Sequence, residues 1–586
     1  MKPAAESRTA QSRREFLKGV AGAGVVAGSL GAGVAVSPPS AAASPLQSAA
    51  RQRGRGGGPA SSDDFGRMFP HLRPFAEAND RVRAALLDVG RQGGVLDAQD
   101  DLAAGPTRLI VDPTVNGNPT ATDPYGSNPD NPTMTAGSTF VGQFTDHDIT
   151  FDQTSRLGVP QDPLISPNTR TPALDLDSVF GGGSGIRPDL YVDNADGSVG
   201  PKLKIGSGGV HEDVPRLPNG DGTYTALLGD PRNDENVIVA GLHCAHVLIY
   251  NRVVDELSEF DLSAFPANPP GARPDGYAAF LLARQVTLWH YQWLLVNEHL
   301  PQIAGQAVVD DVLQSGGRFY TPPPGDAFMP IEFGAACYRF GHSMVRPSYR
   351  ANFTCGTGDS TSPTADPFFA LVFDPDEPDF SAPPRDDRDD LLGGFPAPRR
   401  YVGWQTFFDF GDGQVKNNKR IDTTISSVLF TLPVPAIAPR TQTAPTVLPQ
   451  RNLLRQLTWG LPSGQALARE IGVPPLSTAD LAEIAAVHRP FAVRTPLWYY
   501  ILAEAKAAAD GLNLGPVGGR VVAETLIGLL RADPTSYLTV CPGFTPFLGS
   551  DLRLGPGLDP NITGNRTYTR AHFLYYAGVV TPGTYR

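Results

Sequence analysis

The chain has 586 residues, a formal net charge of −12 and no basic patch, which argues against nucleic-acid binding. Its four cysteines, Cys244, Cys337, Cys355 and Cys541, are too few for a disulfide scaffold and lack zinc-binding spacing, although one or two disulfides could form in an oxidising compartment. The 63 Gly and 57 Pro predict many loops.

The N-terminus has the pattern of an export signal. A twin-arginine segment at Ser12–Lys18 precedes a weakly apolar stretch and the small residues Ala41–Ala43. The alternative is a membrane anchor, but the stretch is Gly-rich, which disfavours a stable transmembrane helix. We expect a signal peptide over 1–43, a disordered linker over 44–65, and a mature chain without a stable membrane span in the extracellular or periplasmic space. No other segment is expected to reach membrane-spanning length.

The remainder, residues 66–586, is predicted to be mainly α-helical, with long loops and few short strands. A strand is expected near Lys202–Ile205. Helical periodicity is clearest over Glu235–Leu257, Ala278–Val296, Glu332–Val345, Ser477–Ala486, Leu497–Ala509 and Val521–Arg531.

A histidine between two aspartates stands out in the segment 142–148. Burying Asp146, His147 and Asp148 is costly unless the charges have partners, so an exposed acidic loop is one interpretation. The neighbouring residues are apolar, however, which favours a partly buried helix that carries functional charge. On a helix Gln143 and His147 share a face.

Three further segments carry candidate chemistry. Oxygen donors alternate at Thr171, Asp175 and Asp177, as a hard cation or a simple polar turn would have them. Arg232 and Glu235 lie one turn apart, a spacing that is usually a surface salt bridge. The fourth segment, 333–345, is apolar with a single histidine, His342; such a residue is more often a core histidine than a metal ligand.

These four segments together resemble the animal-type haem peroxidase superfamily over roughly residues 130 to 470. The chain has Gly-Gln-x-x-Asp-His-Asp from Gly142, Gly-Asp-x-Arg-x-x-Glu from Gly229, and Arg-x-Gly-His-Ser from Arg339, all in family order. Asn452 precedes Gly460-Leu461-Pro462 at the family's offset. The resemblance implies a single large helical haem-peroxidase domain over 66–586.

The resemblance also implies roles for individual residues. His147 would be the distal base, Arg232 the catalytic arginine and Gln143 a hydrogen-bonding residue of the pocket. The residues expected to bind the cofactor are Asp146 and Glu235 through ester bonds, His342 as the iron ligand, and Asn452 and Arg339 in support of it. The expected calcium ligands are Asp148, Thr171, the carbonyl of Ala173, Asp175 and Asp177. Asn236 stands where some relatives have a methionine bonded to haem, so that link should be absent.

The implied activity is reduction of hydrogen peroxide by an ester-linked haem b, with calcium bound nearby. An oxoferryl intermediate would oxidise a small reducing substrate, either a halide or pseudohalide or a phenol. One alternative is a fatty-acid dioxygenase of the same superfamily. It is disfavoured because Arg339 occupies the position of the radical-forming tyrosine, and Tyr338 is expected to point elsewhere. The other alternative is a haem-binding or structural protein without turnover.

Overall fold

The computed structural model describes residues 65–111, 128–209, 211–266, 276–353, 367–375, 390–396, 400–433, 445–552 and 568–581. The signal peptide predicted over 1–43 lies outside the described residues, as does most of the linker predicted over 44–65. The last linker residue, Phe65, is instead a buried strand residue, because it pairs with Met329.

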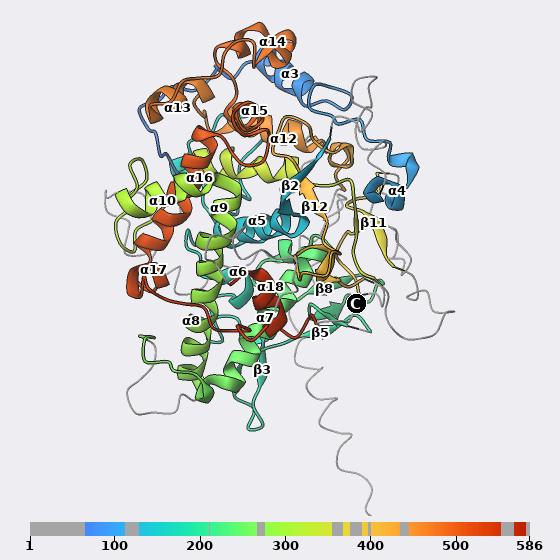
Figure 1. Cartoon of the computed structure of the whole chain (residues 1–586), viewed down its shortest axis with the longest axis vertical. Helices are drawn as coiled ribbons and strands as arrows, with labels where there is room; N and C mark the ends of the chain where they lie inside the picture. Colours follow the sequence, from blue (N-terminus) through green and yellow to red (C-terminus); the bar gives the residue numbers. More distant parts are fainter. Residues whose placement is uncertain are drawn as a thin grey trace, which may run out of the picture. The chain divides into compact units, whose positions relative to one another are not determined.

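Helices dominate the described part of the chain, as predicted (Figure 1). The α-helices are α3 (Asp80–Val89), α4 (Pro106–Val111), α5 (Ala136–Ile149), α6 (Asp177–Phe180), α7 (Val237–Glu256), α8 (Gly276–Leu294), α9 (Leu300–Ala304), α10 (Gln306–Ser315), α11 (Ile331–Gly334), α12 (Leu448–Thr458), α13 (Gly464–Ile471), α14 (Ala482–Val487), α15 (Leu497–Ala509), α16 (Pro516–Ala532), α17 (Tyr537–Val540) and α18 (Arg570–Tyr576). Short 3₁₀ helices include η5 (Pro231–Asp234), η8 (Cys337–Met344) and η10 (Ser427–Phe430).

The strands are short and pair only in twos. They are β1 (Phe65–Gly66), β2 (Asp130–Thr135), β3 (Tyr191–Asp193), β4 (Val199–Leu203), β5 (Gly206–Ser207), β6 (Glu212–Asp213), β7 (Arg216–Pro218), β8 (Tyr224–Ala226), β9 (Met329–Pro330), β10 (Ser348–Arg350), β11 (Phe369–Leu371) and β12 (Asn417–Lys419). The pair β1–β9 is parallel, and the other five pairs are antiparallel. Sheets this small cannot form a core, so the helices must supply it.

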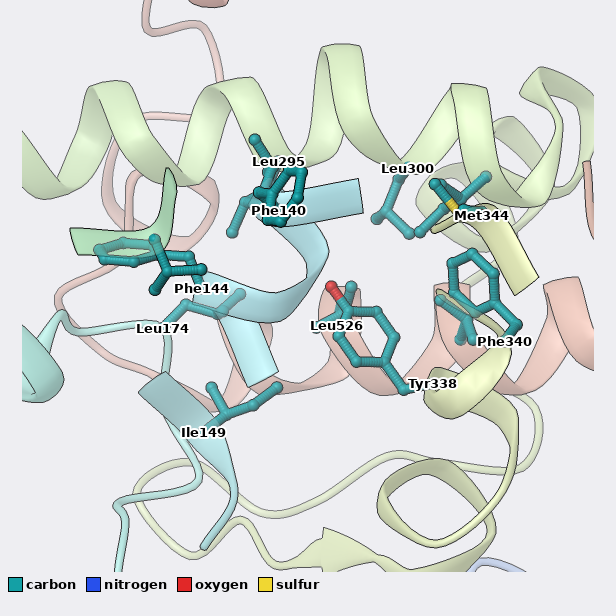
Figure 2. Packing of buried hydrophobic residues seen from close by; sticks show 14 of the residues in the cluster. Phe140, Phe144, Ile149, Leu174, Leu295, Leu300, Tyr338, Phe340, Met344 and Leu526 are labelled. Carbon is teal, nitrogen blue, oxygen red and sulfur yellow. The ribbon is translucent and has the colours of Figure 1, made fainter. Parts of the chain in front are cut away.

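The core surrounds α5, which packs against α7 and against η8. Phe140 and Phe144 of α5 belong to one large apolar cluster with Leu295 and Leu300, and Figure 2 shows these side chains together. Tyr338 of η8 enters the same cluster (Figure 2). Because most residues of α5 are buried, including His147 and Asp148, these polar side chains are held in a low-dielectric setting.

Most predicted helices are present, with shifted ends. The predicted Leu497–Ala509 helix is α15 without change, and the last prediction, Val521–Arg531, lies inside the longer α16. The predicted Ser477–Ala486 helix starts later, at Ala482. Ser477 and Asp480 do hydrogen-bond reciprocally, but they close a turn before α14 and not its first helical turn.

The predicted Glu332–Val345 helix is wrong as a single element. It consists of α11, which ends at Gly334, and the 3₁₀ helix η8, which begins at Cys337. Ala336 between them has φ −138° and ψ −70°, outside the α region, which interrupts the hydrogen-bond ladder. A 3₁₀ helix places residues i and i+3 on one face, so side chains of η8 point differently from those of an α-helix.

One described helical stretch, Val237–Glu259, is long and apolar enough to cross a membrane, which corrects the expectation that no such segment exists. In the structure 72% of its most apolar window is buried. Cys244, Cys337 and Cys541 are free thiols. Cys355 lies outside the described residues, so disulfide pairing through it stays an open expectation.

Candidate active site

One cavity is lined by all eight residues that the sequence assigned to catalysis or cofactor binding. Three elements contribute most of them: α5, the turn η5 with Glu235 after it, and η8; Asn452 comes from α12. The eight are Gln143, Asp146, His147, Arg232, Glu235, Arg339, His342 and Asn452. We call the side formed by α5 and η5 the distal wall, and the side formed by η8 and α12 the proximal wall.

His147 is the buried histidine of the distal wall. Its Nδ1 lies 3.0 Å from the side-chain oxygen of Asn233, and its Nε2 lies 3.7 Å from Oε2 of Glu235. Burial, with Arg232 acting in the same direction, lowers the pKa of His147 to about 4. The imidazole is therefore neutral at pH 7 and able to accept a proton.

Arg232 is fixed by acceptors on three sides. Its Nε and Nη2 donate to the Asp230 carboxylate at 3.1 and 2.8 Å, and Nη2 also donates to the carbonyls of His147 and Thr150. The guanidinium stacks 4.0 Å from the Phe151 ring centroid. Burial opposes the charge of Asp230, but Arg232 and Arg170 outweigh it and lower the pKa of that carboxyl. The result is a rigid cation at the cavity wall.

Glu235 ends a chain of amide hydrogen bonds. Asn236 donates to the Gln143 oxygen at 3.2 Å, and Gln143 donates to Oε2 of Glu235 at 3.2 Å. Burial raises the pKa of Glu235 to about 7, so the carboxyl is partly protonated near neutral pH. Asp146 lies one helical turn before Thr150, whose hydroxyl donates to it at 2.9 Å. Both carboxyls face the cavity.

On the proximal wall the nearest partner of His342 is an amide. The side-chain nitrogen of Asn452 lies 2.7 Å from Nδ1 of His342. An amide can make the same contact with its oxygen, which would put the proton on Nδ1 and leave Nε2 free for a metal. Burial, followed by Arg339, lowers the pKa of His342 to about 3, so it is neutral.

Arg339 stands behind His342 with two more arginines. Its Nε donates to the Gly334 carbonyl at 2.9 Å, and burial lowers its pKa to about 9. Arg451 and Arg455, from α12, also line the cavity. Arg455 pairs with Asp152 at 2.6 Å. The three guanidinium groups outnumber the two carboxylates near Arg339, which are those of Asp146 and Asp152. This end of the cavity is therefore suitable for an anionic group.

The expectation that Tyr338 points away from the site is wrong. Tyr338, Gly341 and Met344 are spaced by three residues on a 3₁₀ helix, and all three line the cavity. The Tyr338 hydroxyl comes within 4.0 Å of the position that a Cβ on Gly142 would occupy. The tyrosine therefore reaches the distal helix α5.

The predicted calcium residues lie apart from the cavity, behind α5. The Asp148 carboxylate accepts from the backbone of Leu176 at 3.0 Å and of Ser178 at 3.4 Å. Asp175 and Asp177 pair instead with Arg284 and Arg170 at 3.4 and 3.2 Å. Thr171 and Ala173 are half-buried on the same loop. Within the described ranges, no three His, Cys, Asp or Glu side chains are arranged to hold a metal.

Comparison with known proteins finds a family likeness for part of this chain. The family model described as animal haem peroxidase matches residues 163–376, which include Arg232, Glu235 and His342. The match covers less than half of the chain, so it gives a likeness to animal haem peroxidases over this segment.

Individual relatives are distant. A human protein named probable oxidoreductase PXDNL is 29% identical over 150 residues, which are 25% of this chain and 9% of that protein. Peroxidase A from Dictyostelium discoideum has 16% identity, covering 90% of this chain and 96% of its own, with a TM-score of 0.53. Fatty acid alpha-dioxygenase from Arabidopsis thaliana has 14% identity, covering 88% and 76%, with a TM-score of 0.49. The helical haem-peroxidase fold predicted from sequence is confirmed.

The residues that line this cavity fit a haem. Gly341, directly before His342, lines the cavity, and no heavy atom lies within 4 Å of where its Cβ would stand. A flat group can thus approach the backbone beside the imidazole. A neutral histidine with a hydrogen-bonding partner on its second nitrogen is the donor set that haem iron takes.

Three residues of the candidate site were not predicted from the sequence. Asn233 and Asp230 orient His147 and Arg232, yet neither lines the cavity. Their only signal was a position within the Gly-Asp-x-Arg-x-x-Glu segment. His299 does line the cavity, and its buried Nε2 has no hydrogen-bond partner among the described residues. It lies in a π-helical turn (Leu295–His299), and the predicted Ala278–Val296 helix ended before it reached His299.

Proposed function

We propose that this protein is an exported haem peroxidase that reduces hydrogen peroxide and oxidises a halide, pseudohalide or phenol. The observation that carries the proposal is that His147 and His342, 195 positions apart in the sequence, line one cavity, each with Nδ1 against a buried amide. One imidazole is thus prepared to move a proton and the other to bind iron.

The proximal wall would hold the cofactor. His342 would bind the iron through Nε2, with the Asn452 oxygen accepting from Nδ1–H to set the tautomer. Arg339, beside it, would offset negative charge on the haem edge. When bound, the haem would supply the redox chemistry that splits peroxide.

The distal wall would move the proton. His147 would accept a proton from peroxide at Nε2 and return it to the departing oxygen. Arg232, held by Asp230, would stabilise negative charge on that oxygen without having to reorient. Gln143 would help to position the peroxide by hydrogen bonding. The carboxyls of Asp146 and Glu235 would anchor the haem through ester bonds to its methyl groups; each bond would replace a methyl C–H, and hydrogen peroxide would take up the two electrons and be released as water.

A calcium ion would stabilise the loop behind the distal helix. Burial, followed by Asp175, raises the pKa of Asp148, and burial raises that of Asp175 to about 6. A divalent cation would relieve this crowding of carboxylates, with Thr171, the carbonyl of Ala173 and Asp177 completing an oxygen shell. Asp175 and Asp177 would have to exchange their arginine partners for the ion.

The remaining parts of the proposal concern the whole chain. Residues 66–586 would form one peroxidase domain, exported after a signal peptide over 1–43 is removed. The twin-arginine pattern suits export of a protein that folds around its cofactor before crossing the membrane.

The test is an absorption spectrum of the purified protein before and after addition of hydrogen peroxide. A haem band that shifts with peroxide and returns on adding bromide, iodide, thiocyanate or a phenol would support peroxidase turnover. A colourless protein, or a haem band indifferent to peroxide, would contradict it and favour a binding or structural role.

Fatty-acid oxygenation is the second candidate, because Tyr338 lines the cavity. A buried tyrosine beside a haem can be oxidised, and the sequence argument against this reaction assumed that Tyr338 pointed away. Oxygen uptake with linoleate, lost in Tyr338→Phe, would favour this candidate. Unchanged peroxidase turnover in Tyr338→Phe without oxygen uptake would exclude it.

A further inference from the structure

Asn233 is a fully buried residue that contacts two imidazoles at once. It lies in η5 between Arg232 and Glu235, but its side chain faces away from the cavity. Its oxygen is 3.0 Å from Nδ1 of His147, and its nitrogen is 3.2 Å from Nδ1 of His243. Neither contact alone reveals which way round the amide sits.

A third contact fixes the amide. The Asn233 nitrogen lies 3.4 Å from the backbone carbonyl of Ser178, on the same side as His243. A carbonyl can only accept, so the group facing it must be the NH₂. The oxygen then faces His147, and an oxygen without hydrogen can only accept. The proton of the neutral His147 ring is therefore on Nδ1.

This arrangement decides which nitrogen of His147 can act as a base. With Nδ1 protonated, Nε2 carries the lone pair, and Nε2 is the nitrogen on the cavity side, 3.7 Å from Glu235. An amide oxygen accepts from Nδ1–H without a full charge, so it sets the tautomer and stabilises the imidazolium less than a carboxylate would. A carboxylate at position 233 would favour the protonated ring more strongly and leave less of the ring in the neutral form that can accept a proton.

We propose that Asn233 is a positioning residue of the distal wall, which keeps Nε2 of His147 available to accept the proton of peroxide. The proposal rests on the proposed peroxidase function. Asn233 also joins the distal base to the loop that carries the predicted calcium ligands, because Ser178, whose carbonyl it contacts, donates to Asp148.

The first experiment uses haem-loaded protein and Asn233→Leu, which has a similar size and no hydrogen bonds. General-base catalysis contributes about 10²–10⁴-fold, so the second-order rate of reaction with peroxide should fall by about 100-fold. Association of cyanide, which binds as the anion after giving up its proton, should slow in parallel. The KM for the reducing donor should not change, since the donor does not need the base.

The matched control is Asn131→Leu. Asn131 is also fully buried and hydrogen-bonded, to the carbonyls of Gly511 and Leu512, but it is not in the cavity wall. Both variants should lower the melting temperature, whereas only Asn233→Leu should slow peroxide and cyanide. Wild-type rates in Asn233→Leu, or equal slowing in both variants, would overturn the proposal.

A haem-independent measurement separates this proposal from the peroxidase proposal. Long-range ¹H–¹⁵N spectra of the haem-free chain labelled with ¹⁵N-histidine report which ring nitrogen is protonated, and His147→Gln assigns the signal. We expect the Nδ1–H form in the wild type and a mixture in Asn233→Leu. If the wild type bound no haem, the peroxidase proposal would fail while this result still decided the role of Asn233. An Nε2–H signal in the wild type would overturn the proposed role of Asn233.

Discussion

On each wall of the cavity an asparagine amide contacts Nδ1 of the histidine, but only the distal amide has its orientation fixed by further contacts. On the distal wall, the Asn233 amide contacts His147, His243 and the Ser178 carbonyl, and these contacts allow one orientation. On the proximal wall, the described contact of the Asn452 side chain is with His342 alone. Nothing in that pair prevents the amide from turning over.

The difference follows from what each imidazole is proposed to do. A base must present the same lone pair before any ligand arrives, so its tautomer has to be set by the protein. A metal ligand is set by the metal itself, because a nitrogen bound to iron cannot carry a proton and Nδ1 must then carry it. The proximal amide can adopt its final orientation when the iron binds.

The largest effect should come from removing the proximal ligand. His342→Ala should lower haem affinity by more than about 100-fold, because changes one step further from the metal already cost 10–100-fold. Haem titration followed at the absorption band measures this. His71→Ala is the control, since His71 is exposed and paired with Glu470 at the surface. A haem band unchanged in position and stoichiometry would remove His342 from its assigned role.

Removing the distal cation should lower the reaction rate and leave haem affinity unchanged. Arg232→Gln should slow the reaction with peroxide by about 10²–10³-fold, the usual loss when one stabilising donor is removed, while haem affinity stays the same. Arg232→Lys keeps a positive charge beside the buried Asp230 and serves as the control for a folding defect caused by the unpaired carboxylate. Stopped-flow absorbance gives both rates. A full rate in the glutamine variant would mean that the arginine is only structural.

The haem-free chain should lose stability in acid, because His147 and His342 are buried in their neutral form. The folded pKa of His147 is about 4 and that of His342 about 3, against an ordinary 6.5, so the unfolded chain binds more protons below pH 6.5. Their stability contribution is complete above pH 6.5 and is lost as the pH falls toward 4 and 3. His147→Gln should recover on the order of 3 kcal/mol at pH 4. Urea unfolding at pH 7 and pH 4 measures the difference; equal losses in variant and wild type would contradict neutral burial.

The sequence predicted which residues line the cavity better than it predicted the secondary structure that carries them. His147 and Gln143 were placed on one helix face because α-helical spacing is regular, and α5 is a regular helix. The proximal segment has the same kind of apolar pattern but folds as α11 and η8, since the break at Ala336 depends on tertiary packing. Tyr338 was misplaced for that reason. Asn233 could not be found, because its contact with His147 joins residues 86 positions apart.

The smallest effect should separate the two amides. Asn452→Leu leaves His342 without a partner on Nδ1, yet bound iron would still hold the tautomer, so the peroxide reaction should slow by only about tenfold. Asn233→Leu frees the tautomer of His147 and should cost about ten times more. The two variants, compared in the same stopped-flow series with haem affinity measured alongside, test whether the metal supplies what the proximal amide lacks. If Asn452→Leu were the slower variant, the proximal tautomer would have to be set by the protein, and the asymmetry between the walls would be only apparent.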